Sequence, residues 1–146
     1  MRQIQQDPIA YVQQRSERFF TSGSVNAVEL ATQIVGEVFL LGGHEACAIR
    51  DDAWWVIGSN VDWLGNHSDY SAKELFFQIV AFPEAGANSM RAEILLMAFA
   101  QDVITKGAEG QVVIKGKVEE SEKVWHLIVS RPGWKRAVAF RLVLQL

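Results

Sequence analysis

Only one cysteine, Cys47, occurs in the 146 residues, so the chain cannot form an internal disulfide. A single thiol fits a reducing compartment. The chain turns polar at Arg2 and Gln3, where a signal peptide would become apolar, and no run approaches the ~18 uncharged apolar residues of a membrane span. These features predict a cytoplasmic protein without a membrane segment.

Motifs that announce a metal site or a catalytic site are also missing. Neither Cys-x-x-Cys nor His-Glu-x-x-His spacing occurs, and the three histidines are scattered, so we assign no metal and no cofactor. His44 and Cys47 are the residue types of a thiolate nucleophile, but on an extended segment they face opposite sides. We therefore expect Cys47 to be a small buried residue with a structural role. No residue is assigned a catalytic role, although catalysis is not excluded.

The composition indicates one folded domain over residues 1–146. Apolar residues make up 49% and charged residues 21%, which is typical of a globular protein with a single core. The net charge of −3 is unevenly distributed: residues 1–105 hold six Lys or Arg against thirteen Asp or Glu, whereas residues 106–146 hold eight against four. Phosphate contacts need clustered cations, and none occur here, so nucleic-acid binding is disfavoured.

Two helices are predicted near the N-terminus. Asp7 can cap the first, with Pro8 at its first position, and Ser22-Gly23 ends it. Ser24 can cap the second, whose apolar residues recur at intervals of three or four up to Leu41. Gly42-Gly43 would stop this second helix.

Strands are predicted from Ala46 onward. Residues 46–50 and 54–59 are rich in strand formers and flank Asp51-Asp52, which predicts an antiparallel hairpin with Trp54 and Trp55 on opposite faces. Residues 74–82 are apolar on both alternating sets, as in a central strand, and Pro83 ends them.

The second half is predicted to contain one long helix, over residues 90–106, lying deep against the sheet. Three more strands are expected over residues 111–118, 123–130 and 136–146, and short links between them favour antiparallel pairing. The predicted fold class is therefore α+β, with about six strands in the order ααβββαβββ.

Large aromatics and carboxylates concentrate between His44 and Tyr70, a stretch that holds three of the five tryptophans. Rigid rings supply contact area, and acids attract and orient a partner. We therefore expect a protein-binding module with a basic protein partner, of the inhibitor, immunity or chaperone type found among small bacterial proteins. Its expected contact residues are Trp55, Asp62, Trp63, Asp69 and Trp134.

Two alternatives stay open at this point. Trp63 either projects from a loop as an anchor or folds back as a lid on the core. The alternative to a protein-binding module is a small-ligand binder or an enzyme. Its pocket would lie between the sheet and helix 90–106 and would be reached by His44, Trp54, His67 and Arg91. Association between copies of the chain is compatible with either function.

Overall fold

The structure, a computed structural model, describes residues 7–65 and 69–142. Its helical elements are α1 (Pro8–Gln13), α2 (Ser16–Phe19), α3 (Ala27–Leu40), the short 3-10 helices η1 (Glu74–Phe76) and η2 (Pro83–Ala85), α4 (Glu93–Phe99) and α5 (Lys123–Val129). Its strands are β1 (Ala46–Asp51), β2 (Trp54–Ser59), β3 (Asp102–Gly107), β4 (Gly110–Lys115) and β5 (Arg136–Arg141).

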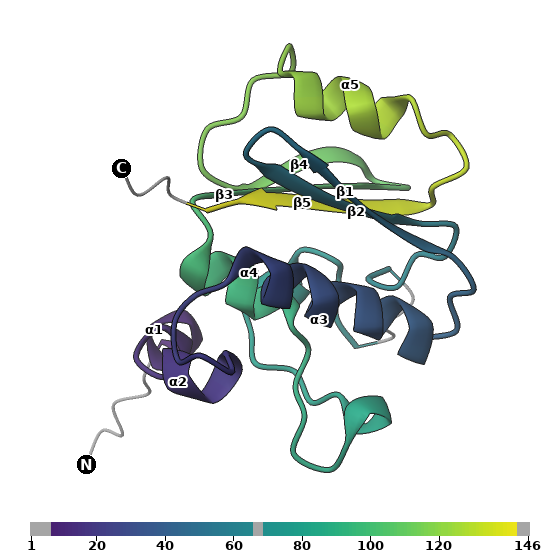
Figure 1. Cartoon of the computed structure of the whole chain (residues 1–146). Helices are drawn as coiled ribbons and strands as arrows, with labels where there is room; N and C mark the ends of the chain where they lie inside the picture. Colours follow the sequence, from purple (N-terminus) through teal and green to yellow (C-terminus); the bar gives the residue numbers. More distant parts are fainter. Residues whose placement is uncertain (1–6, 66–68, 143–146) are drawn as a thin grey trace.

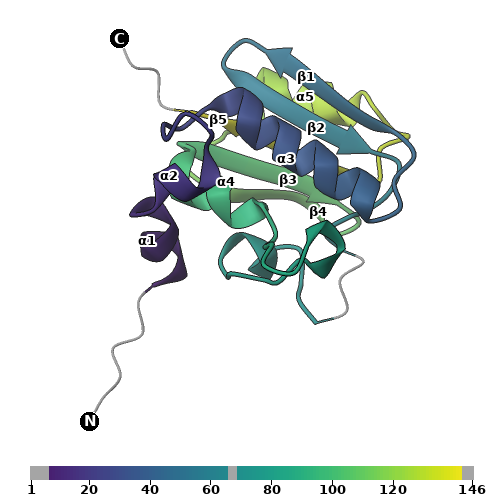
Figure 2. The same cartoon turned by 60° about the horizontal axis from the view of Figure 1, so that its bottom comes forward.

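The strands form one antiparallel sheet in the order β1-β2-β5-β3-β4. Helices α3 and α4 cover one face of this sheet, and α5 covers the other (Figure 1). Turned by 60°, the molecule shows α3 lying along the sheet, with α1 and α2 at its side (Figure 2). The α+β class and the antiparallel pairing are confirmed, although the sheet has five strands in the described residues rather than six.

The β1–β2 hairpin forms as predicted. Its strands pair from Ala46 opposite Ser59 to Asp51 opposite Trp54. Asp52 turns the chain with a positive φ of 58°, a conformation that Asp tolerates better than most residues. Trp54 is buried on the α5 face, whereas Trp55 is half-buried against the core under α3, so the prediction of opposite faces is confirmed.

The N-terminal helices are confirmed with different bounds. The Asp7 carboxylate accepts a hydrogen bond of 3.0 Å from the amide of Ile9, which is the predicted cap. The first helical segment divides into α1 and α2. The second helix is capped by Asn26, whose side chain accepts from the Glu29 amide at 3.0 Å, rather than by Ser24.

The strand predicted over residues 74–82 is wrong. The chain instead makes the 3-10 helix η1, and only Ala81 forms an isolated bridge, with Met90. Leu75, Phe76, Val80 and Phe82 are nonetheless buried. Apolar residues at both odd and even positions of this segment correctly indicated burial, but burial alone does not specify a strand.

The long helix predicted over residues 90–106 is also wrong. Helix α4 ends at Phe99, Ala100 is extended, and the chain continues as strand β3 from Asp102. The β-branched run Val103, Ile104 and Thr105 favours this change because such side chains lose rotamer freedom in a helix.

Residues 123–130 form helix α5, so the strand predicted there is wrong as well. Val124, Trp125 and Ile128 recur at helical spacing and are buried against the sheet. The predicted strands at 111–118 and 136–146 are present as the shorter β4 and β5. Residues 143–146 lie outside the described part of the chain.

The sheet separates two apolar cores. The larger lies between the sheet and α1, α3 and α4, and the smaller lies under α5. Within the described residues, none of the helices combines the length and the apolar character that crossing a bilayer requires.

Candidate functional site

The predicted tryptophan and aspartate surface does not form as one surface. The Trp63 side chain is 1% exposed and packs in the larger core, so its role as a projecting anchor is wrong and the alternative of a lid on the core holds. Trp55 is half-buried, with the Arg50 guanidinium 5.9 Å from its ring centroid. Asp69 is exposed.

Asp62 serves inside the molecule. Its carboxylate accepts hydrogen bonds of 2.8 Å and 2.9 Å from Nε and Nη2 of the buried Arg136, which also donates to Thr105 and pairs with Glu109. Partial burial opposes ionisation of Asp62, but the bonds from Arg136 and from two backbone amides outweigh it and lower its pKa. This ion cluster fastens the loop after β2 to the sheet, so Asp62 is engaged within the fold rather than available to a partner.

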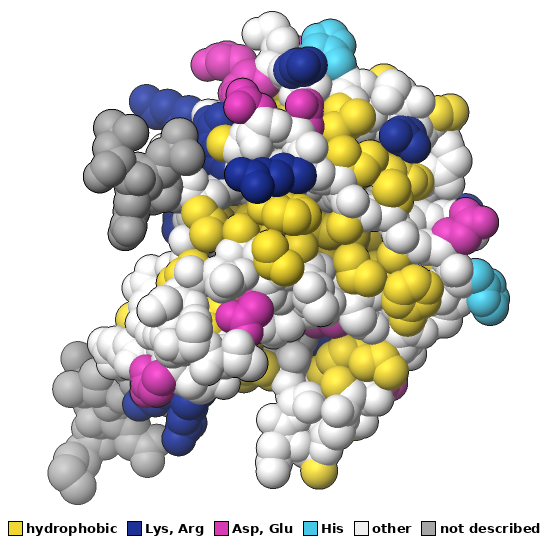
Figure 3. Space-filling view, in the orientation of Figure 1, with side chains coloured by type: hydrophobic (Ala, Val, Ile, Leu, Met, Phe, Trp, Pro, Cys, Tyr) yellow, Lys and Arg dark blue, Asp and Glu magenta, His cyan; other side chains and the backbone are white. Residues whose placement is uncertain are grey.

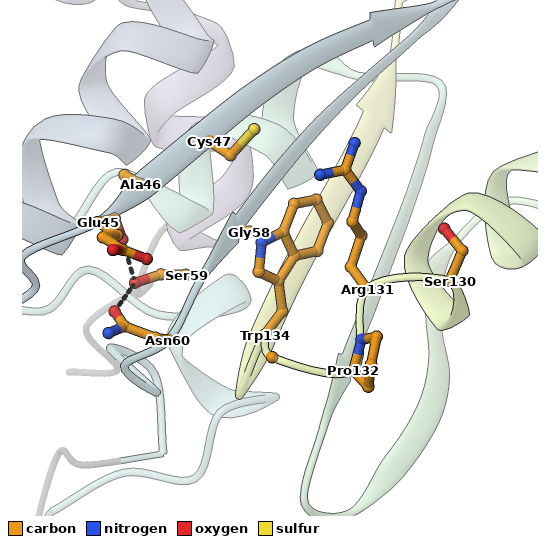
Figure 4. A pocket seen from close by; sticks show the side chains of 11 residues that line it. Glu45, Ala46, Cys47, Gly58, Ser59, Asn60, Ser130, Arg131, Pro132 and Trp134 are labelled. Carbon is orange, nitrogen blue, oxygen red and sulfur yellow. Dashed lines mark hydrogen bonds between the residues drawn. The ribbon is translucent and has the colours of Figure 1, made fainter.

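Trp134 lies on the opposite side of the sheet from Trp55 and lines a cavity of about 350 Å³ (Figure 4). Its ring covers Gly58, and the Arg131 guanidinium is 5.5 Å from the ring centroid. The Cys47 side chain points toward the same cavity and is half-buried, not buried as expected. A single flat partner surface therefore cannot contact both Trp55 and Trp134.

The alternative pocket is not assembled either. Trp54 is buried in the smaller core beneath the Arg141 guanidinium, 4.6 Å from its ring centroid, while Arg91 is buried on the other side of the sheet. His44 is exposed before β1, and His67 lies outside the described residues. The predicted helix 90–106 is divided into α4 and β3, so the helix that was expected to cover this pocket does not form in the described residues.

An open cleft lies instead between α1–α2 and the segment of residues 79–90, which we call the arm. The arm extends away from α3 in Figure 1, and hydrogen bonds of 2.9 Å and 2.8 Å close its base, from Phe82 N to Ser89 O and from Arg91 N to Val80 O. Two adjoining hollows of about 770 Å³ and 400 Å³ make up the cleft. Their shared lining residues are Arg18, Phe19, Asn88, Ser89 and Met90.

A buried charged cluster lies at one wall of this cleft. Glu37 of α3, Arg91 and Glu93 are each no more than 3% exposed, and Glu37 is also a lining residue of the smaller hollow. Arg91 Nε lies 3.1 Å from Glu93 Oε1 and 3.3 Å from Glu37 Oε2, and its Nη2 donates to the Trp63 carbonyl at 3.0 Å. Burial and the adjacent Glu93 carboxyl raise the pKa of Glu37 well above its ordinary value.

The outer face of α3 is unusually apolar. Val28 is 57% exposed, Phe39 51% and Leu40 50%, with Thr32 and Val35 completing the face between them. Helix α3 contains only two charged residues, Glu29 and Glu37. Glu29 accepts a hydrogen bond from the backbone amide of Thr21, and Glu37 is buried. Figure 3 shows hydrophobic side chains gathered across the region where α3 lies in Figure 1.

Part of this surface could have been recognised from the sequence. Residues 27–40 hold only two charged side chains, Glu29 and Glu37, whereas a helix that covers one face of a domain usually has a charged outer face. The buried side of α3 is formed by Leu30, Ala31, Ile34 and Val38, which leaves Val28 exposed. The cluster of Glu37 with Arg91 and Glu93 could not be recognised from the local sequence, because Glu37 lies more than fifty residues before the other two.

In the described part of the chain, no three His, Cys, Asp or Glu residues are grouped as a metal site would require. Comparison with protein-family models, curated proteins and solved structures finds no match.

Proposed function

We propose that this chain is a protein-binding module whose partner docks on the outer face of α3. The proposal rests on one observation: the side chains on this face are apolar and highly exposed, and none of them is charged. Val28 and Phe39 are each more than half exposed. A surface helix normally directs charged side chains to solvent, and contiguous apolar surface of this kind is a feature of interaction sites.

The spacing on this face suits a helical partner. Val28, Thr32, Val35 and Phe39 follow one another at intervals of four, three and four, which is the spacing of a helix-packing seam. Leu40 extends the apolar surface to the cleft, where it is a lining residue. A partner helix with an apolar stripe would cover the seam, and basic groups at its edges would suit the acidic residues 1–105.

The class of function is the one expected from the sequence, but the proposed binding surface is the outer face of α3 instead of the tryptophan and aspartate residues. Trp63 and Asp62 support the fold instead of forming the interface. A role as a bacterial inhibitor, immunity-type or chaperone-type protein in the cytoplasm is compatible with an apolar helix face, and it remains part of this proposal.

The test compares three forms of the protein as bait in native lysate. The double variant Val28→Asp, Phe39→Asp places charge on the α3 face, and Val129→Asp places it on α5, where Val129 is 53% exposed on the far side of the sheet. A true partner should bind wild type and Val129→Asp equally and should lose about thirtyfold or more in affinity for the α3 variant, as removal of a central anchor predicts.

The lysate comparison needs two accompanying measurements. Urea unfolding of each bait shows that lost binding is not lost folding. Sedimentation velocity over a range of concentrations shows whether the partner is a second copy of the chain. Proteins that bind all three baits equally would contradict the proposal.

The cleft supports a second candidate function, the binding of a small apolar ligand. Its larger hollow of about 770 Å³ lies within the size range of small-molecule sites. However, Ile79 and Leu40 at its walls are 43% and 50% exposed, so a small ligand would stay partly in water. Binding of an apolar fluorescent dye to wild type, with loss in Ile79→Asp, would favour this function.

A further inference from the structure

The charges of the buried cluster at the cleft do not balance if every group is ionised. Glu37 and Glu93 supply two carboxyl groups, and Arg91 supplies the single guanidinium that contacts them. All three side chains are almost fully removed from water. From the neighbouring elements, Arg18 of α2 lines the same hollow, but no ion pair joins it to either glutamate in the described residues. One buried carboxylate would thus be left without compensation.

A single proton resolves both the charge and the hydrogen bonding. Glu37 Oε2 and Glu93 Oε2 are buried and receive no hydrogen bond from the described residues when both groups are treated as acceptors. The two carboxyl groups converge on one atom, because Glu37 Oε2 lies 3.3 Å and Glu93 Oε1 lies 3.1 Å from Nε of Arg91. Ionised carboxylates only accept, so a bond between them requires a proton on one of the two. With that proton in place, one carboxylate remains to face Arg91.

The cluster also joins the base of the arm to α3. The second oxygen of Glu37 accepts a hydrogen bond from the backbone amide of Ala92. The backbone amide of Arg91 donates to Val80 O at 2.8 Å, and its guanidinium lies 5.4 Å from the ring centroid of Phe82. Separation of Glu37 from Arg91 and Glu93 would therefore remove the link between α3 and the base of the arm, which forms one wall of the cleft.

We propose that a proton shared by Glu37 and Glu93 acts as a clasp that holds the arm against α3 and thereby sets the width of the cleft. When the proton leaves, two carboxylates that are almost fully removed from solvent face one guanidinium, and their repulsion is relieved when the base of the arm moves away from α3. This clasp does not depend on the proposed partner of α3.

The test follows amide hydrogen exchange by NMR between about pH 6 and about pH 9, after correction for the intrinsic pH dependence of exchange. The amide of Ala92 reports the clasp, and that of Val138 in the sheet is the internal control. We expect exchange at Ala92 to rise by about tenfold or more relative to Val138 across this range. Carbon-13 shifts of the two glutamate carboxyl groups should show that only one is ionised at neutral pH.

Glu37→Gln is the matched variant because its amide keeps the shape, cannot ionise, and can both accept from Ala92 and donate to Glu93. Its Ala92 amide should exchange without the rise at alkaline pH. Glu84→Gln, on the exposed tip of the arm, should behave as wild type. If Glu37→Gln does not fold, Glu93→Gln replaces it, and the wild-type carboxyl titration still decides the question.

Two results would overturn the proposal. The first is ionisation of both carboxyl groups at neutral pH with Ala92 still protected. The second is an alkaline rise in exchange that persists unchanged in Glu37→Gln.

Discussion

Trp134 lies directly over Gly58, and its indole occupies the space that a side chain at position 58 would fill. Gly58 is the penultimate residue of β2, where it pairs with Ala137 on one side and Cys47 on the other. Glycine in a strand interior costs backbone entropy, so its presence here marks a close approach by another group. The contact fixes the loop between α5 and β5 against the sheet.

Gly58→Ala should therefore destabilise the protein by about 1–3 kcal/mol, because the new methyl group would displace the Trp134 ring. Gly133→Ala, in the same loop, is the matched control because open space surrounds position 133. Urea unfolding measures both. Equal midpoints for the two variants would contradict the close contact.

Trp63→Ala should lower stability by about 3–5 kcal/mol, since a fully buried indole leaves a large cavity when it is removed. The same substitution at an exposed anchor would leave the urea midpoint almost unchanged. Comparison with Trp134→Ala, at a half-buried ring, should show a smaller loss. This measurement separates the lid from the anchor independently of any partner.

Asp62→Asn should cost about 1–3 kcal/mol at neutral pH because it removes a charged acceptor from the buried Arg136. The pKa of Asp62 is lowered in the folded state, so its stabilisation is present above the unfolded value of 3.8 and is lost as the pH falls through the folded value. The acid limb of a stability profile should be flatter in Asp62→Asn than in wild type. Asp51→Asn, at a surface pair with Lys123, should retain the wild-type profile.

Glu37 predicts the opposite pH dependence. Its folded pKa is raised, so its favourable contribution is complete below the ordinary value of 4.5 and declines as the pH rises toward the folded value. Wild type should thus lose stability as the pH rises from 4.5 toward the folded pKa of Glu37. Chemical unfolding at a series of pH values should show this loss in wild type and a smaller one in Glu37→Gln.

Cys47→Ala should cost about 1 kcal/mol or less, because the thiol is half-buried and contributes a small packing area. A thiol reagent should label the native protein more slowly than the unfolded chain. Fast labelling that His44→Ala slows would instead indicate an activated thiol and would favour an enzyme.

The sequence predicted local features where chemistry and geometry are local. The cap at Asp7, the turn at Asp51-Asp52 and the opposite faces of Trp54 and Trp55 each depend on a few adjacent residues, and all are confirmed. The helix prediction for residues 90–106 is wrong because a continuous apolar run indicates burial but is compatible with either a helix or a strand. The break at Ala100 carries no proline or glycine to reveal it.

The candidate surfaces needed tertiary information. Asp62 is 74 residues from Arg136, and Glu37 is 55 residues from Ala92, so neither engagement can be inferred from spacing. The apolar outer face of α3 was visible as composition, but which side faced water depended on the sheet beneath it. Long-range pairing decided what each polar or aromatic residue does.

Strand β5 gives the sheet an unusual dependence on one segment. The hairpins β1–β2 and β3–β4 do not pair with each other; each pairs with β5, which lies between them. Neither hairpin alone buries both of its faces, and an isolated two-stranded hairpin is marginal in water. The protein is therefore suited to fragment complementation: a chain ending before Arg136 would hold an open slot, and a separate peptide carrying β5 would restore the sheet by filling it.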